Sequence, residues 1–477
     1  MQLHVYNTLT RKKELFVPLM EDPDYKGPKK DFVGFYSCWP TVYRDPTIGN
    51  FRATFTADLI RNTLKLLEYT VKSVMNITDV GHLVSDADEG EDKLEKWSKR
   101  EGISAWDVAK KYEDIFKEGM KLLHIDEFDV MPRATENIPE QIALVKTLEE
   151  KWYTYMVPGD GIYMDTSKVE DYGELMWPNY KKRLADLNAG ERVNMWGKKN
   201  PTDFALRKFS PENEQRQMER DSPRWKWFPG RHIECSAMSS KYLWNQFDIH
   251  HGGADHITIH HPNEIAQSEC WFDVHPRVKY RIHNEFLQVD GGRMWKSLGN
   301  AHTLQDIQNK WFSVLDLRYF YFTAQYGNFQ NFTWDQLEAA KNTRHTLIKK
   351  LQWKRIMKDK NDFESDPIFQ QVIEALCDDM NTPKLLAVIQ SALTIWWENV
   401  FAIITWLEDN LLKLWLFDAI IEESFDIPDE VTALADQRVQ AKQDKNYALA
   451  DELRNKITVA WFQLKDTKDG YEITKNN

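Results

Sequence analysis

The chain has 477 residues and a formal net charge of −12 at pH 7, a length that allows roughly two to four domains and a large core. The negative charge excludes nucleic-acid binding through an overall positive charge, so any such binding would require a local basic surface. Its four cysteines show no paired spacing, which argues against a disulfide scaffold and favours a reducing compartment. Because it lacks an apolar signal segment and a bilayer-length apolar run, the sequence predicts a cytoplasmic protein without membrane contact.

The N-terminal part predicts a parallel α/β unit. Residues 32–38 (FVGFYSC) have the composition of a buried strand, residues 51–69 show helical apolar spacing, and residues 69–80 predict a second strand. A strand, loop, helix and second strand in this order form a parallel crossover, as in doubly wound sheets.

The remaining segments predict helices and short strands around a loop-rich insertion. The expected elements are charged helices over 88–150, a turn and short strand at 159–167, the insertion at 170–230, short strands at 231–238, 247–261 and 279–290, and helices from about 335 to the end.

Four side chains have the chemistry of a metal site. Cys38 ends the first strand, and Cys235 lies near another expected strand end, so both belong at the carboxyl edge of a parallel sheet. His260 and Glu264 are four residues apart, which places them on one face of a helix. Two thiolates, an imidazole and a carboxylate suit Zn²⁺. Their spacing matches no local zinc motif, so by spacing alone two ordinary buried cysteines and a surface His/Glu pair are favoured.

The segment PTIGN (46–50) lies between the first strand and the following helix. Gly49 permits close backbone approach, Thr47 and Asn50 offer hydrogen bonds, and a helix N-terminus favours a phosphate. A plain turn explains the same residues when the segment stands alone.

Two further glycine-bearing segments carry charged residues. DGGRMWKSLGN (290–300) predicts a mobile basic loop able to bring Lys296 over a phosphate. DIHHGGADH (248–256) predicts a tight turn that presents Asp255 to an ammonium or ribose group. A solvated turn and an Asx turn are the respective alternatives.

Taken together and in this order, these segments resemble the cysteinyl-tRNA synthetases, a family of class I aminoacyl-tRNA synthetases. The resemblance covers essentially the whole chain. Agreement of several long sequence motifs in a fixed order outweighs the structural alternatives given above for each motif alone. The segments that carry it are SCWPTVY with TIGNFR, NITDVGHL, MPRATENIPEQI, DGIYMDTS, HIECSAMSSKYL, HHGGADHITIHHPNEIAQSE, HNEFLQVDGG, MWKSLGN and NYALADELRNKI with DTKDGYEI.

The resemblance implies an α/β fold with a Rossmann-type catalytic domain and a connective insertion, then an α-helical bundle and a small C-terminal domain. We expect the catalytic domain over 1–335, with the insertion at about 115–225 and the signature loop at 290–300. The helical bundle is expected over 336–430 and the anticodon-binding domain over 431–477.

The resemblance also implies roles for individual residues. It assigns the zinc ligands to Cys38, Cys235, His260 and Glu264, and catalysis to Lys296. It places the "HIGH" and "KMSKS" ATP signatures on Thr47, Ile48, Gly49 and Asn50, and on Arg293, Met294, Trp295, Lys296 and Ser297. It assigns substrate contacts to Thr78, Arg231 and Asp255.

The implied reaction is cysteine–tRNA ligation. L-Cysteine and ATP give cysteinyl-adenylate, and the acyl group passes to the 3′ end of tRNA(Cys). One Zn²⁺ per chain binds the substrate thiolate, Mg²⁺ accompanies ATP, and the enzyme is expected to be a monomer. Two alternatives stay open: a decayed paralogue that binds zinc and tRNA without activity, and a cysteine ligase that acts on a small amine. The helices after residue 335 argue against the second, because such a ligase needs no anticodon reader.

The chain departs from the family pattern in a consistent way. Tryptophan stands where the family has glycine, and arginine where it has tryptophan, so that "SPRWKWFPGRHIEC" corresponds to "SPWGKGFPGWHIEC". The composition agrees, with 20 glycines and 19 tryptophans among 477 residues against a usual glycine content of about 7%. The Trp-for-Gly positions are 39, 152, 177, 225, 227, 244, 311 and 461; the Arg-for-Trp positions are 207, 220, 224, 231, 277 and 281.

These exchanges predict a reassigned genetic code, because Gly→Trp is sterically among the least tolerable changes. Trp106 and Trp334 fit the family as tryptophans. Thr47 and Asn50, which replace the two histidines of "HIGH", do not fit this scheme, and the shorter Thr47 weakens the expected contact with ATP.

Overall fold

The computed structural model describes residues 1–38, 42–79, 93–176, 197–209, 220–221, 226–294, 299–351, 354–394, 398–417, 428–444, 446–460, 462–467 and 470–475. The chain forms two compact units, Met1–Leu416 and Phe417–Asn477.

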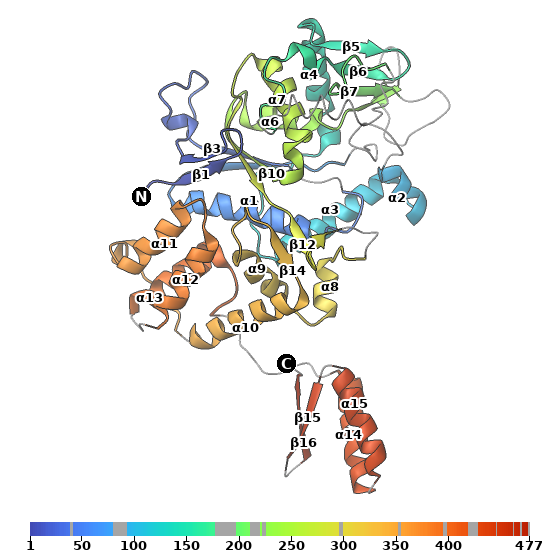
Figure 1. Ribbon diagram of the computed structural model, residues 1–477, viewed down its shortest axis with the longest axis vertical. Helices are drawn as coiled ribbons and strands as arrows, with labels where there is room; N and C mark the ends of the chain where they lie inside the picture. Colours follow the sequence, from blue (N-terminus) through green and yellow to red (C-terminus); the bar gives the residue numbers. More distant parts are fainter. Residues whose placement is uncertain are drawn as a thin grey trace. The chain divides into compact units, whose positions relative to one another are not determined.

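A four-stranded parallel sheet lies at the centre of the first unit (Figure 1). Its order is β11 (Val278–Asn284), β10 (Phe247–Gly253), β3 (Val33–Ser37) and β4 (Val71–Met75). All five residues of β3 are buried, because helices cover both faces of the sheet, and none of the five has a charged or amide side chain, as is typical of parallel strands. The predicted parallel crossover from 32–38 to 69–80 is confirmed.

The crossover helix α1 (Ile48–Leu66) packs on one face of this sheet, and α6 (Ile233–Leu243) packs on the other. In Figure 1, α1 lies below the strands, and α6 and α7 (His260–Phe272) lie above them. In the sheet register, Ser37 lies opposite His251 on one side and Met75 on the other. The strand ends therefore form one edge, and the residues that follow them meet there.

The expectation of a strand at 231–238 is wrong, since this segment begins α6. Its apolar residues follow a helical rather than an alternating period. Ile233 and Ala237 pack with Leu144 in one core cluster, whereas Cys235 and Met238 pack against the central sheet. Short apolar segments do not distinguish a strand from a buried helix by periodicity alone. The expected strand over 247–261 likewise ends at Gly253, and His260 begins α7.

An antiparallel sheet lies within the segment where an insertion is expected. Its core combines Ile162, Phe204 and Leu206 with Leu144 and Leu148 of the neighbouring helix. The sheet order is β5 (Thr154–Val157), β6 (Gly161–Met164), β7 (Phe204–Phe209), β9 (Lys226–Pro229) and β8 (Arg220–Asp221), and the helix is α4 (Ile138–Glu150).

Helices dominate the rest of the first unit. They are α2 (Lys93–Glu101), α3 (Ala105–Leu122), α8 (Leu304–Asn309), α9 (Val314–Phe322), α10 (Trp334–Leu351), α11 (Pro367–Cys377), α12 (Thr382–Ala392) and α13 (Glu398–Leu407), with a π-helical turn at Glu408–Leu412. The remaining strands are β1 (His4–Asn7), β2 (Lys12–Leu15), β12 (Leu287–Val289), β13 (Gly292–Arg293) and β14 (Gln330–Phe332).

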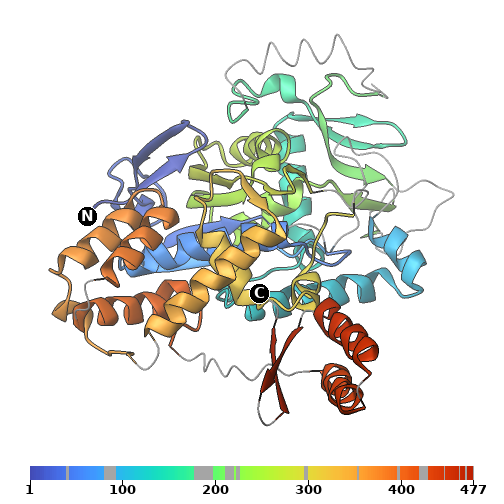
Figure 2. The ribbon, with the colours of Figure 1, turned by 60° about the horizontal axis from the view of Figure 1, so that its bottom comes forward.

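The second unit contains α14 (Asp429–Gln443), α15 (Tyr447–Val459) and a hairpin of β15 (Phe462–Thr467) and β16 (Gly470–Lys475). The two helices and the hairpin are drawn in red in Figure 2. The expectation of helices to the end is wrong after α15, because Phe462 and Leu464 are buried on either side of exposed Gln463, the period of a strand. Among the described residues, no helix has the length and apolarity needed to cross a membrane.

A buried ion network fixes α1 against the helices of the first unit. Arg318 on α9 is 1% exposed, and its Nη2 lies 3.4 Å from Asp58 of α1. The same guanidinium donates to the carbonyls of Leu411 and Leu412 at 2.9 and 2.6 Å and to Leu123 at 2.7 Å. One buried guanidinium thus donates hydrogen bonds to carbonyl groups at the C-terminal ends of α3 and of the π-helical turn. Through its contact with Asp58 it holds both ends against α1.

Replacing Arg318 by methionine should lower the free energy of unfolding by about 3 kcal/mol or more, because three buried carbonyls and Asp58 lose a donor. Urea unfolding followed by circular dichroism measures the change. Lys110→Met is the control, since its pair with Asp114 is 68% and 58% exposed and contributes at most about 1 kcal/mol. Equal losses in the two variants would contradict the role given to Arg318.

Candidate active site

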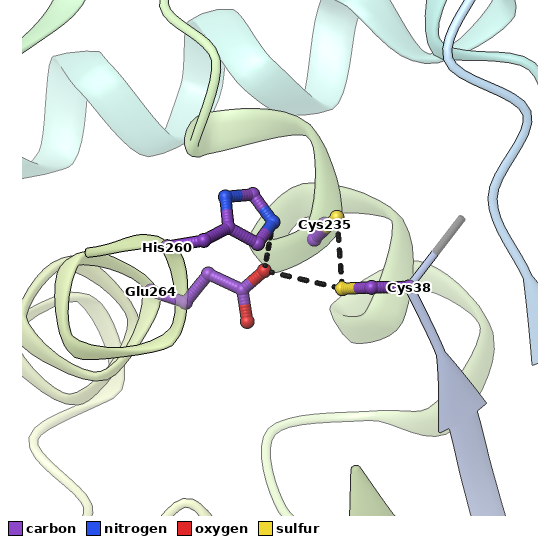
Figure 3. Close-up of side chains that lie close together, drawn as sticks. All are labelled: Cys38, Cys235, His260 and Glu264. Atoms are coloured by element: carbon purple, nitrogen blue, oxygen red, sulfur yellow. Dashed lines mark hydrogen bonds and ion pairs between the residues drawn. The ribbon is translucent and has the colours of Figure 1, made fainter. Parts of the chain in front are cut away.

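The four residues expected to bind metal lie together at the carboxyl edge of the parallel sheet (Figure 3). Cys38 directly follows β3, and Cys235 lies in the first turn of α6. His260 and Glu264 are one turn apart at the start of α7 and point toward the two sulfur atoms. Segments more than 200 residues apart in sequence thus supply one cluster, which no local spacing encodes.

The geometry of this cluster fits a tetrahedral metal ion. The Sγ atoms of Cys38 and Cys235 are 3.5 Å apart, and Glu264 Oε1 lies 3.5 Å from Cys38 Sγ. His260 Nε2 lies 2.8 Å from the same carboxylate oxygen, and the four ligand atoms all lie within 4.8 Å of one another. A zinc ion with ordinary bond lengths requires ligand separations of about 3.3–3.8 Å. The two separations of 3.5 Å meet this requirement, whereas His260 and Glu264, at 2.8 Å, would have to move slightly apart around an ion. The described residues therefore could hold such an ion.

Burial makes the cluster unfavourable for negative charge without a cation. Burial raises the pKa of the Cys38 thiol well above its usual value, and the contacts with Cys235 and Glu264 raise it further. Burial also raises the pKa of Glu264 to about 7. A bound divalent cation reverses this preference, because it favours the thiolate and carboxylate forms.

Histidines that the sequence analysis did not single out surround the ligands. His232 Nδ1 lies 2.8 Å from His260 Nδ1, which leaves His260 Nε2 for the cluster. His250 Nε2 lies 3.2 Å from Cys38 Sγ, and His250 and His261 form a second possible ligand set with Cys38 and Glu264. The histidine pairs in DIHHGG and TIHHPN were the available signal. Such outer residues orient metal ligands and fix their tautomers.

The N-terminus of α1 faces the region where ATP is expected. Thr47 and Asn50 form a capping box: the Thr47 hydroxyl accepts from the Asn50 amide N–H at 3.3 Å, and Asn50 Oδ1 accepts from Thr47 N–H at 2.9 Å. Thr47 Oγ1 also donates to Asn50 Oδ1 at 3.0 Å. Asn50 Nδ2 has no partner among the described residues, so it is the side-chain donor available for a ligand here.

The two expected ATP segments lie next to each other. A Cβ atom on Gly49 would be 3.6 Å from Met294 Cε, and Ile48 N–H donates to the His302 carbonyl at 2.9 Å. The chain on both sides of the signature loop thus contacts the start of α1. Trp295, Lys296 and Ser297 lie outside the described residues, as does the side chain of Arg293.

The three expected substrate residues have different surroundings. Thr78 is buried and donates to Glu234 Oε2 at 3.1 Å, beside Cys235. Arg231 is partly buried directly before His232. Asp255 lies on the turn after β10, with a side chain 53% exposed. The structure brings Thr78 to the α6 end of the cluster; no contact among the three is found within the described chain.

Comparison with known proteins places this arrangement in a family. The family model of the catalytic domain of class I (C) tRNA synthetases matches residues 26–342. The solved Mycobacterium tuberculosis methionyl-tRNA synthetase in complex with methionyl-adenylate is similar with a TM-score of 0.52 and 14% identity, covering 81% of this chain and 89% of that chain. At this identity the likeness concerns the fold alone.

Curated relatives extend the similarity over the whole length. The cysteine–tRNA ligase 1 of Burkholderia lata is 40% identical over 491 residues, covering 99% of this chain and 97% of that protein. The cysteine–tRNA ligase of Treponema denticola is 38% identical, covering 98% of each chain. The cysteine–tRNA ligase of Thermococcus gammatolerans is 35% identical, again covering 98% of each.

The parallel sheet with its edge site and the family match define a class I aminoacyl-tRNA synthetase. Within this class, the chain belongs to the cysteine–tRNA ligase family. The resemblance stated from the sequence motifs and the predicted fold class are therefore confirmed.

Cys235→Ser should remove most of the bound metal from the purified protein, because it replaces a soft thiolate in a four-ligand site by a weak hydroxyl ligand. Elemental analysis after exhaustive dialysis measures the metal content. Cys270→Ser is the matched control, since Cys270 lies on α7 outside the ligand set. Unchanged metal in Cys235→Ser, or equal loss in both variants, would contradict the site.

Proposed function

We propose that this protein is a cysteine–tRNA ligase that activates L-cysteine with ATP and transfers it to the 3′ end of tRNA(Cys). Full-length similarity to cysteine–tRNA ligases supports the reaction. The observation that carries the proposal for this chain is the buried set of two thiols, an imidazole and a carboxylate at the sheet edge. A site that selects a thiol substrate needs soft ligands of this kind.

The cluster supports selection of cysteine. One Zn²⁺ per chain, held by Cys38, Cys235, His260 and Glu264, would supply a soft Lewis acid for the thiolate of the substrate. Burial of Cys38, Cys235 and Glu264 excludes water from the ligands. The hydroxyl of serine is harder and far less acidic than a thiol, so such a site discriminates at the binding step and needs no editing domain.

The start of α1 supports binding of the triphosphate. Its backbone N–H groups and helix dipole favour a phosphate, and the side-chain amide of Asn50 adds a donor. A Cβ at Gly49 would meet only ordinary contacts at 3.6 Å and beyond, so the protein itself does not require glycine there. Close approach of a ligand to the backbone does require glycine at this position. Mg²⁺ is expected to accompany ATP.

In the chemical step, the protein has to position the reactants and stabilise the charge that develops. The α-carboxylate of cysteine attacks the α-phosphate of ATP, the bond to the β-phosphate breaks, and pyrophosphate leaves with the bonding electrons. Lys296, matched to the "KMSKS" signature, stabilises the charge that develops on the phosphates. A terminal ribose hydroxyl of tRNA then attacks the acyl carbon, and AMP leaves.

The rest of the chain supports tRNA as the acceptor. Residues 336–430 are proposed as the helical bundle and 431–477 as the anticodon-binding domain; α14, α15 and the hairpin form a compact core in the latter region. A ligase acting on a small amine would not need this unit. We also propose a monomeric enzyme, and a cytoplasmic location, which the four free cysteines support.

Cysteine-dependent exchange of pyrophosphate into ATP, followed by charging of tRNA(Cys), tests the proposal. The protein is expected to catalyse both reactions and to prefer cysteine strongly over serine. Zinc and tRNA binding without either reaction would instead support a decayed paralogue. Exchange without tRNA charging would support a ligase for a small amine.

Lys296→Ala is expected to lower the rate of adenylate formation by roughly 10²–10³-fold, because one transition-state donor is lost. The dissociation constant for cysteine should stay unchanged, since the thiol is bound elsewhere. Single-turnover exchange kinetics and calorimetric titration measure the two quantities. Lys310→Ala, at an exposed position, is the control, and parallel losses of rate and cysteine affinity would contradict the assigned role.

A further inference from the structure

Tryptophan occupies an unusual share of the strained backbone positions in this protein. Twelve non-glycine residues of the described chain have positive φ, and four of them are tryptophans: Trp152, Trp244, Trp311 and Trp415 at φ values of 64°, 71°, 63° and 55°. A bulky side chain is rarely found in this region, which glycine adopts without cost and Asn or Asp tolerate best. These residues are called the four positive-φ tryptophans below.

Trp152 and Trp311 occupy the glycine position of helix C-terminal caps. After α4, Trp152 N–H donates to the Glu149 carbonyl and Tyr153 N–H donates to the Leu148 carbonyl, both at 3.0 Å. After α8, Trp311 and Phe312 make the equivalent bonds at 2.9 and 3.2 Å. This pattern is the Schellman motif, whose left-handed residue is usually glycine.

Trp244 has a still more restricted conformation. It ends α6 with φ 71° and ψ −168°, in a region populated essentially by glycine. Its amide donates to the Ser240 carbonyl at 3.0 Å, so the backbone of the helix end is fixed. The partly buried indole lies 5.5 Å from the ring of Phe32, and the Lys30 ammonium lies 5.2 Å from its centroid.

Trp415 shows the same strain at a position where the family pattern gave no indication. The amides of Leu414 and Leu416 on either side donate to the buried carboxylate of Glu408, at 2.7 and 3.2 Å. These bonds fix the turn after the π-helical segment and hold position 415 at positive φ. Its side chain is 55% exposed, and the ring contact that the structure gives it is with His124, at 5.0 Å between centroids.

Other tryptophans in the chain pack as tryptophan normally does. The ring of Trp334 lies 5.0 Å from His302, 5.1 Å from Phe332 and 5.9 Å from Phe312. By contrast, Trp152 and Trp311 are 79% and 53% exposed. Tryptophan therefore occurs here in two structural classes, one chosen by packing and one at sites that require glycine.

Buried arginines show the complementary pattern. Arg277 and Arg281 are each 2% exposed, and neither forms an ion pair with a carboxylate of the described chain. Arg277 donates to Ser239, Ser240 and the Asn245 carbonyl, and the guanidinium of Arg281 has a hydrogen-bond contact with His250 Nδ1 at 3.5 Å. Two other buried guanidinium groups are ion-paired, Arg318 with Asp58 and Arg344 with Asp316, and the equally buried Arg52 instead donates to the carbonyls of Glu285, Gln325 and Asn328.

An unpaired buried cation is costly, whereas an indole brings a large apolar ring and a single N–H donor to the same space. Arg277 already lies over the ring of Phe247, at 5.2 Å from its centroid. The surroundings of both arginines thus suit tryptophan better than arginine.

From these two patterns we infer that the cells carrying this gene make the protein with glycine at 152, 244, 311 and 415 and tryptophan at 277 and 281. One codon is then translated as glycine instead of tryptophan, and a second as tryptophan instead of arginine. The backbone evidence adds position 415 to those indicated by the sequence. Among the latter, Trp39, Trp177, Trp225, Trp461 and Arg224 lie outside the described residues, as do the side chains of Trp227 and Arg220.

The gene and the cellular protein give the direct test. The four positive-φ tryptophans should share one codon that differs from the codon of Trp106 and Trp334. Arg277 and Arg281 should share a codon that Arg318 and Arg344 do not use. Peptide masses of the protein isolated from those cells should correspond to glycine and tryptophan at the six exchanged positions. One codon for both tryptophan classes, or tryptophan at position 244 of the cellular protein, would overturn the inference.

Thermal unfolding of recombinant protein gives a second test that does not depend on codon usage. Replacing the four positive-φ tryptophans together by glycine should raise the unfolding midpoint by about 10 °C, because four strained conformations are relieved. Trp334→Gly is the control and should lower the midpoint, because it removes a packed ring. A fall in the midpoint of the fourfold variant, comparable to that of the control, would overturn the inference.

Discussion

Burial of two thiols and a carboxylate at one edge of a parallel sheet is the constraint on which the site depends. Parallel strands end on the same side, so the residue after β3 and the helix that follows β10 meet there. Helix α6, which packs against β3 and β4, brings Cys235 to the same edge. Without a cation, Cys38 and Glu264 are held toward their protonated forms by desolvation. A bound metal ion would offset this cost, and the two thiolate ligands would make it favour a soft ligand.

The second half of the site depends on how α1 is held. Its capped N-terminus faces the signature segments, while its middle is joined through Asp58 to Arg318 and, through Arg318, to the end of α3 and the π-helical turn. The Ile48 N–H donates to the His302 carbonyl and the Asn50 N–H to the Thr47 hydroxyl, which leaves the Gly49 N–H and the side-chain amide of Asn50 for the ligand. The position of α1 is thus determined by a buried ion network rather than by local sequence.

Several residues of this chain have backbone conformations or buried positions that are unusual for their residue type. Functional strain normally gathers at a ligand site, yet Trp152, Trp311 and Trp415 are exposed ends of helices and turns. The unpaired Arg281 does lie beside the cluster, but a guanidinium there opposes the positive charge of a metal ion. Exchanged residue identities explain both observations with one cause, and the fold itself needs no special function for these positions.

The sequence by itself determined the parallel crossover, because an apolar strand, a capped helix and a second strand follow one another within 45 residues of chain. It also indicated the His260–Glu264 pair, which one helical turn brings together. It did not determine that 231–238 is a helix, since a short buried apolar segment has no distinctive period. The strand ends placed Cys38 and Cys235 at one sheet edge, and the family resemblance named all four ligands. Only the tertiary structure gave their separations and surrounded them with His232, His250 and His261, because contacts between distant segments arise from sheet order and packing, which no local spacing encodes.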